Sequence, residues 1–241
     1  MKTTKIEWTD RTWNPVTGCT QKSEGCRNCY AKTMALRLQG MGQAKYKDGF
    51  KVTLQEDVLT EPKGWRLSSM VFVCSMGDLF HEEVPFEFID KVMNTIWETR
   101  HTYQLLTKRP ERMAEYFQNH YVPENAWLGT TVEAAEYKHR IDVLRSIKGS
   151  FKFLSCEPLL GDLGELDLTG IDWVIVGGES GGKARPMKEE WVLNIKKQAE
   201  AQGVAFFFKQ WGTWGSDGVK RSKKDNGKLL QGKICQEYPQ K

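Results

Sequence analysis

Residues 13–30, WNPVTGCTQKSEGCRNCY, hold three of the six cysteines of this chain in the pattern C-x6-C-x2-C. Glycines directly precede Cys19 and Cys26, and glycine lets a backbone fold tightly around a small object. Clustered thiolates suit iron–sulfur or zinc chemistry. Three cysteines, Cys19, Cys26 and Cys29, favour a four-iron cluster in which one iron stays open for another ligand. A zinc site completed by a distant His or Cys, and thiols that bind nothing, stay open as alternatives.

The composition is that of a globular protein with one large domain or two small ones. Basic and acidic residues number 35 and 31, so the net charge of +4 permits a nucleic-acid or phosphorylated substrate without requiring one. No apolar run resembles a signal peptide, and none approaches a membrane span. We therefore expect a cytoplasmic protein without a membrane partner, in which clustered cysteines are ligands rather than disulfides. Cys74 and Cys156 lie inside apolar runs and are predicted to be buried, whereas Cys235 carries no clear signal.

Apolar runs alternate with amphipathic segments along most of the chain. The predicted strands are 12–16, 50–54, 70–75, 103–107, 126–131, 151–156, 171–178 and 204–209, and the predicted helices are 31–40, 56–65, 85–100, 110–120, 133–147 and 188–203. Nearly continuous apolar strands separated by helices are typical of parallel strands covered on both faces. The pattern favours a single (β/α) barrel, complete, partial or irregular, over an open α/β sheet. We assign residues 1–214 to the barrel domain and 215–241 to a basic, polar C-terminal tail.

Polar residues follow six of the predicted strands, at the end where the active site of such a barrel lies. They are Asp78, His81, Glu82, Glu83, Lys108, Arg109, Thr130, Thr131, Glu133, Glu157, Glu179, Ser180, Lys183, Arg185, Lys209, Gln210 and Trp211. Gly177 and Gly178 let a ligand approach the backbone closely, although a tight turn after a strand explains them equally well. Glu179 offers a carboxylate for an amine or hydroxyl, and Lys108 offers an ammonium for a carboxylate.

Seven motifs, CTQKSEGCRNCYA, SMGDLF, LTKRP, GTTVE, SCEPLLG, GGESG and FFFKQWG, occur in this order and resemble a phage-associated family of three-cysteine proteins of unknown function. More broadly, a three-cysteine loop after the first strand of a barrel resembles the radical S-adenosylmethionine (radical SAM) superfamily. The resemblance implies a [4Fe–4S] cluster held by Cys19, Cys26 and Cys29. The open iron would take the amino and carboxylate groups of S-adenosylmethionine.

The same resemblance implies an enzyme that takes an electron from a donor, cleaves S-adenosylmethionine and uses the 5′-deoxyadenosyl radical to abstract hydrogen from a substrate. It places Tyr30 near the adenine. Lys108, Gly177, Gly178 and Glu179 are the further cofactor-binding candidates, because they follow predicted strands. The chain departs from the superfamily in its x6 rather than x3 gap, and its GGE follows a later strand. A nucleotide or nucleic acid is the candidate substrate, on the basis of basic strand-end residues and tryptophans.

Two other functions stay open. The first is a non-catalytic iron–sulfur or zinc protein that binds nucleic acid through the basic residues 220–224, with Trp211 and Trp214 as stacking platforms. The second is an ordinary barrel hydrolase or lyase with Glu133, Glu157 and Glu179 as acid–base groups, which leaves the cysteine loop unexplained.

Overall fold

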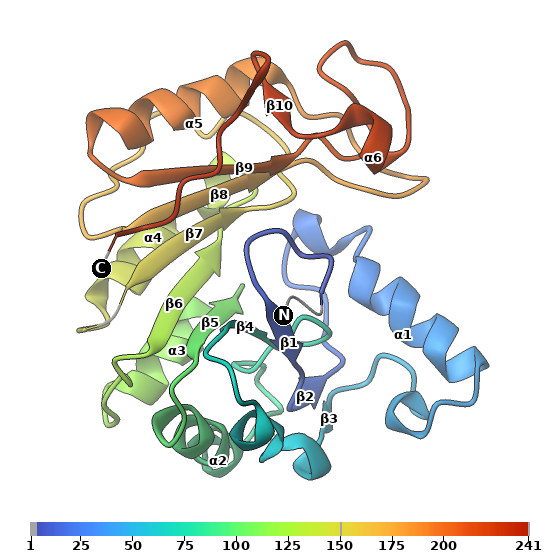
Figure 1. The fold of residues 1–241 in the computed structure, drawn as a ribbon, viewed down its shortest axis with the longest axis vertical. Helices are drawn as coiled ribbons and strands as arrows, with labels where there is room; N and C mark the ends of the chain where they lie inside the picture. The colour runs from blue at the N-terminus through green and yellow to red at the C-terminus, as the bar shows by residue number, and fades with distance from the viewer. Residues whose placement is uncertain (1–3, 150, 241) are drawn as a thin grey trace. The chain divides into compact units, whose positions relative to one another are not determined.

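The structure, a computed structural model, describes residues 4–149 and 151–240 (Figure 1). It is a mixed α/β fold with a seven-stranded sheet in the order β1-β4-β5-β6-β7-β8-β9. The chain divides into two compact units: unit 1 takes the described residues among 1–129 and 147–150, and unit 2 those among 130–146 and 151–241. The α/β class is therefore confirmed. Within this sheet, neighbouring strands follow one another in sequence order, which is compatible with the partial form of the expected barrel.

Unit 1 contains β1 (Arg11–Trp13), β2 (Val16–Thr17), β3 (Thr53–Leu54), β4 (Met70–Val73), β5 (Thr102–Thr107), α1 (Tyr30–Gly40), α2 (Phe86–Trp97) and α3 (Pro110–Phe117), with short 3-10 helices η1 (Glu24–Cys26), η2 (Ala44–Tyr46), η3 (Glu56–Val58) and η4 (Glu61–Gly64). Strands β1, β4 and β5 are parallel neighbours, with Thr12 opposite Phe72 and Phe72 opposite Gln104. Their carboxyl ends therefore meet at one edge. Helix α3 begins at Pro110, soon after β5 ends. Proline suits this first helical position, because the backbone N–H that it lacks would have no partner within the helix.

The division between the two units falls within strand β6 (Ala126–Thr131), after Gly129. Unit 2 contains η5 (Ala135–Tyr137), α4 (His139–Ser146), β7 (Lys152–Cys156), β8 (Trp173–Gly177), α5 (Glu189–Ala201), β9 (Ala205–Gln210), α6 (Lys223–Asn226), β10 (Leu229–Leu230) and β11 (Lys233–Ile234). Strands β7, β8 and β9 are parallel, and every residue of β7 and β8 is buried. This burial explains the unbroken apolar sequence of β8, whereas β7 also buries Lys152 and Ser155. Figure 1 shows α5 running alongside β9.

Three local expectations are wrong. Of residues 50–54, only Thr53–Leu54 form a strand, and it pairs antiparallel with β2 outside the seven-stranded sheet. Residues 56–65 form two 3-10 turns, Glu56–Val58 and Glu61–Gly64, rather than a helix. The helix expected over 133–147 begins later, because Glu133 is buried against Arg140 instead of lying on a helix surface.

The C-terminal segment pairs with the last strand of unit 2. Phe208 N donates to Cys235 O at 2.6 Å, and Glu237 N donates to Phe206 O at 3.0 Å. The Trp173 indole N–H donates to Glu237 O at 2.9 Å. Much of residues 215–228 is exposed, as expected for a polar segment. Among the helices that the structure describes, none has the length and apolar character needed to span a bilayer.

Candidate functional site

The cysteine loop, residues 18–29, begins beside the end of β4. Gly18 N donates to Met76 O at 2.9 Å, and Cys19 N donates to Phe50 O at 3.2 Å. Gly18 has φ +81, and a Cβ placed there would lie 1.9 Å from Lys51 O. Glycine is thus required at this position by the close approach of another backbone and by the left-handed conformation. These contacts fix the start of the loop at the carboxyl ends of β1 and β4.

A buried ion pair joins the ends of β4 and β5. Arg109 Nη1 donates to Asp78 Oδ2 at 3.1 Å, and both side chains are at most 7% exposed. The Asp78 carboxylate also accepts from Thr107 Oγ1 at 2.8 and 2.9 Å and from Phe80 N at 3.0 Å. A buried carboxylate satisfied by several donors and one cation is held firmly, because losing a partner would leave an uncompensated charge.

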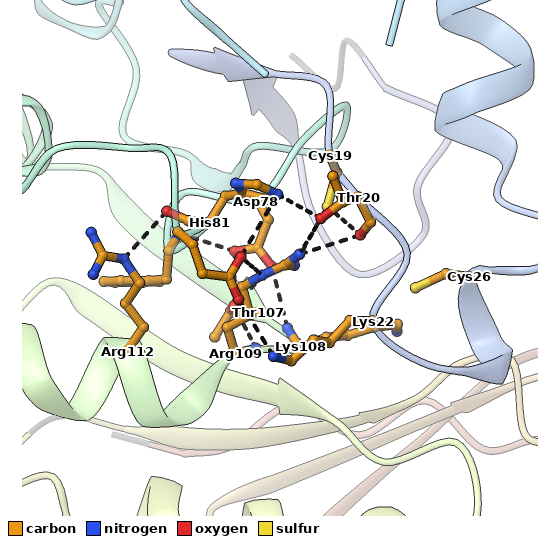
Figure 2. A network of polar contacts seen from close by, with 12 residues as sticks. Cys19, Thr20, Lys22, Cys26, Asp78, His81, Thr107, Lys108, Arg109 and Arg112 are labelled. Carbon is orange, nitrogen blue, oxygen red and sulfur yellow. Dashed lines mark hydrogen bonds and ion pairs between the residues drawn. The ribbon is translucent and has the colours of Figure 1, made fainter. Parts of the chain in front are cut away.

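The same arginine extends this pair to the cysteine loop (Figure 2). Arg109 Nη1 lies 3.5 Å from Cys19 Sγ, and Nη2 donates to Thr20 Oγ1 at 3.0 Å and to Thr20 O at 3.3 Å. Arg109 Nε donates to Glu82 Oε2 at 2.6 Å. A guanidinium carries five N–H donors in one plane, so a single side chain can hold all these groups. We call Thr20, Asp78, His81, Glu82 and Arg109 the arginine network.

His81 completes the network as a neutral donor. Its Nδ1 lies 3.1 Å from Glu83 N, and a backbone N–H can only donate, so we assign the ring proton to Nε2. Nε2 then donates to Thr20 Oγ1 at 2.8 Å. Burial lowers the pKa of His81 below 6.5, and the Arg109 charge lowers it further, against the opposing effect of nearby carboxylates.

The three cysteines of the loop are free thiols, each partly exposed, whereas Cys74 and Cys156 are buried as predicted. Burial raises the pKa of Cys19 to about 12. The Asp78 charge adds to this rise, Arg109 opposes it, and Cys26 adds a smaller increase. A metal would therefore have to displace a proton from Cys19. Within the described part of the chain, no three His, Cys, Asp or Glu side chains are grouped so as to hold a metal ion.

The side chains of the loop are of the type that an iron–sulfur cluster uses, although the described residues of the loop are not grouped around one point. Clusters take cysteine thiolates from proteins, and three partly exposed thiols lie on this one loop. Cys26 is near enough to Cys19 to raise its pKa, and Arg109 offers a hydrogen-bond donor to the Cys19 sulfur. Cys19, Cys26 and Cys29 are thus the residues that would hold such a cluster.

Two of the predicted cofactor-binding residues lie in unit 1 with the cysteines. Tyr30 begins α1 directly after Cys29, and its hydroxyl donates to Ser75 O at 2.5 Å while the side chain remains 58% exposed. The backbone N of Lys108 lies 3.4 Å from Asp78 Oδ2, so this lysine borders the arginine network. Unit 1 therefore contains all three cysteines, Tyr30 and Lys108.

The other three predicted residues lie in unit 2. Glu179 is 6% exposed and accepts three hydrogen bonds from Arg185: from N at 2.8 Å, Nε at 3.0 Å and Nη2 at 2.6 Å. A Cβ on Gly178 would lie 1.9 Å from Trp211 O, and one on Gly177 would lie 2.8 Å from Glu157 Oε1. The missing side chains of these glycines make room for neighbouring protein atoms.

Sequence reasoning missed Thr20 and did not single out Arg109. It selected Lys108 from the same KRP motif, although Arg109 is the residue that contacts the cysteine loop. The alternation of side chains along an extended segment was the available signal. Thr107 and Arg109 share one side of that segment, and Thr107 also hydrogen-bonds Asp78.

Comparison with known families identifies the chain at the family level. Residues 3–239 match the model of a family described as "Protein of unknown function (DUF5131)". The chain belongs to this family. No curated protein and no solved structure matches it. The DUF5131 match spans both units, and its description carries no activity, so function is argued from the site.

Proposed function

We propose that this DUF5131 protein is an iron–sulfur enzyme of the radical SAM type, with a radical-SAM-like partial barrel, in which Cys19, Cys26 and Cys29 hold a [4Fe–4S] cluster. The observation that supports it is the contact between Arg109 and Cys19, which joins the cysteine loop to a buried ion pair at the strand ends. When bound, the cluster supplies the electron that cleaves S-adenosylmethionine to a radical able to abstract hydrogen.

The chain's own residues would bind and orient the cofactor. The Lys108 ammonium suits the methionine carboxylate, and the exposed Tyr30 ring offers a flat face for the adenine. Gly177, Gly178 and Glu179 stay predicted cofactor contacts, and the Glu179 carboxylate is held by its hydrogen bonds from Arg185. The proposed substrate is a nucleotide or nucleic acid, and the reaction takes its electron from a separate donor.

The non-catalytic alternative needs exposed aromatic platforms beside basic residues. Trp211 is buried against Phe208, with ring centroids 5.0 Å apart, so it offers no stacking face. Trp214 donates to Ala184 O at 2.7 Å and lies under the Lys220 ammonium. Trp211 therefore cannot serve as a stacking platform, either in that alternative or for the proposed nucleotide substrate.

The test is reconstitution of the purified chain with iron and sulfide in the absence of oxygen. We expect a broad visible absorption, about four irons per chain, and slow formation of 5′-deoxyadenosine when dithionite and S-adenosylmethionine are added. Mass spectrometry measures the nucleoside, and metal analysis distinguishes the cluster from zinc, which gives no visible band. A colourless protein with one equivalent of zinc would refute the proposal.

Cysteine variants supply matched controls. Replacing Cys19, Cys26 or Cys29 by Ala should abolish iron retention, because two thiolates remain. Cys74→Ala and Cys156→Ala should keep the iron and lose only packing stability, of order 1 kcal/mol, because both side chains are buried. Iron that survives a loop variant, or is lost with Cys74→Ala, would contradict the ligand assignment.

A further inference from the structure

Arg109 contacts groups that lie far apart in the sequence, and one of them is a proposed ligand. Its side chain is 3% exposed, yet it touches Asp78 and Glu82 on one side and Cys19 and Thr20 on the other. The nearest of these is 27 positions away and the farthest is 90. An arginine needed only to neutralise Asp78 would not require the contacts with the cysteine loop.

The contact with Thr20 fixes the position of its neighbour Cys19. Arg109 donates to both the carbonyl and the hydroxyl oxygen of Thr20, and His81 Nε2 donates to the same hydroxyl. Cys19 therefore lies between Gly18, hydrogen-bonded to Met76, and a residue held by two buried side chains. The exposed Lys22–Glu82 pair at 3.4 Å adds little, because exposed ion pairs are weak.

The contact with the sulfur has an electrostatic consequence. Hydrogen bonds to the sulfurs and the local charge are among the features that set the reduction potential of iron–sulfur clusters. One electron added to a cluster increases its negative charge, and a buried guanidinium next to a ligand sulfur stabilises that added charge. Asp78 shares the arginine's Nη1 with Cys19, so its negative charge offsets the guanidinium charge there, and the hydrogen bond to Cys19 Sγ is what Arg109 alone supplies.

We propose that Arg109 is a positioning residue for Cys19. Arg109 holds the start of the cysteine loop and raises the reduction potential of the cluster bound there. The inference rests on the proposed function for its redox part. Its positioning part applies to the chain without cofactor. The two parts have separate readouts, hydrogen exchange of the loop and the cluster potential.

Three variants separate charge from geometry. Arg109→Lys keeps the charge but cannot reach Asp78, Cys19 and Thr20 together. The double variant Arg109→Gln with Asp78→Asn removes both buried charges, so that no unpaired carboxylate prevents folding. Arg112→Gln is the matched control. Arg112 holds His81 O and Val84 O, at 3.3 and 2.9 Å, rather than the cysteine loop.

The first readout is amide hydrogen exchange of a loop peptide in the cofactor-free chain. We expect at least about tenfold faster exchange in Arg109→Lys and in the double variant than in wild type, and unchanged exchange in Arg112→Gln. The second is a redox titration of the reconstituted proteins followed by electron paramagnetic resonance. The double variant loses the hydrogen bond to Cys19 Sγ while its two charge changes oppose each other, so it should shift the equilibrium towards the oxidised cluster by up to about tenfold, about 59 mV for a one-electron couple, and Arg109→Lys should shift it in the same direction.

The outcomes distinguish the two proposals. A wild-type chain that assembles no cluster refutes the proposed function and the redox part, and the exchange experiment still decides the positioning part. A cluster of equal potential in wild type and the double variant overturns the redox part alone. Loop exchange that is unchanged in both Arg109 variants overturns the positioning part.

Discussion

Unit 1 and unit 2 both contain carboxylate–arginine ion pairs that follow a strand, but the partners are separated by different distances along the sequence. In unit 2, Glu179 pairs with Arg185 six positions on, and Glu133 pairs with Arg140 seven positions on. In unit 1, Asp78 pairs with Arg109 across 31 positions, and that arginine continues to Cys19, 90 positions away (Figure 2). The two arginine pairs in unit 2 close one loop each, and Lys209 pairs with Glu157 at 2.8 Å to join two strand ends, whereas Arg109 in unit 1 joins three segments.

The difference teaches where each unit is organised for binding. A pair between sequence neighbours fixes the conformation of its own loop, and the glycines of unit 2 are explained in the same way by neighbouring protein atoms. A pair between distant loops fixes their relative positions, and a binding site assembled from several loops needs this. The arginine network therefore marks the cysteine loop of unit 1 as the best-organised candidate site.

Removing one carboxylate from each unit is the strongest test of this comparison. Asp78→Asn and Glu133→Gln should each lower the free energy of unfolding by about 3–5 kcal/mol, because each leaves a buried arginine without its buried carboxylate partner. Urea denaturation measures this loss. Only Asp78→Asn should also speed trypsin cleavage after Lys22 in the cysteine loop. Equal cleavage in both variants would show that the reach of the pair has no effect on the loop.

A smaller effect comes from the glycine that precedes each candidate segment. Gly18→Ala and Gly178→Ala each place a Cβ 1.9 Å from a backbone oxygen, so a backbone must move in either unit. We expect a loss of about 1–3 kcal/mol for each, from strain of this kind. Gly182→Ala is the control, since its Cβ meets nothing within 4 Å. Thermal denaturation that gives the same midpoint for all three would contradict the packing account.

The sequence predicts the sheet better than the site, for a physical reason. Burial on both faces leaves an apolar run that is readable without the fold, as in β8, and the cysteine pattern is equally visible. The partners of Arg109 are not readable, because they depend on strand ends that meet only in the folded chain. The strand predicted over residues 50–54 is wrong for a related reason, because part of this segment forms a short antiparallel pair with β2 instead.

The pair in unit 2 gives the next prediction. Glu179→Gln removes the charge that Arg185 contacts, and should cost about 1–2 kcal/mol of stability because the arginine is 27% exposed and partly solvated. Iron retention by the cysteine loop of unit 1, the property proposed above, should be unaffected. Calorimetry with S-adenosylmethionine then tests the proposed cofactor role, for which weaker binding is expected. Unchanged binding with lower stability would assign Glu179 to loop structure alone.

The smallest expected effect is a pH dependence that unit 1 owes to His81. The pKa of this histidine is below 6.5 in the folded chain, so below that pH the unfolded chain takes up a proton more readily than the folded one. The free energy of unfolding should therefore fall as pH falls below about 6.5, by the linkage between proton binding and stability. His81→Gln keeps an N–H donor for Thr20 but cannot titrate, so it should lose less stability than wild type between about pH 7.5 and about pH 5.5. His101, His120 and His139 remain in both proteins, so the difference between their urea midpoints isolates His81. An equal pH dependence in the two proteins would mean that His81 has the same proton affinity folded and unfolded, and that its neutral Nε2–H form is not what holds Thr20.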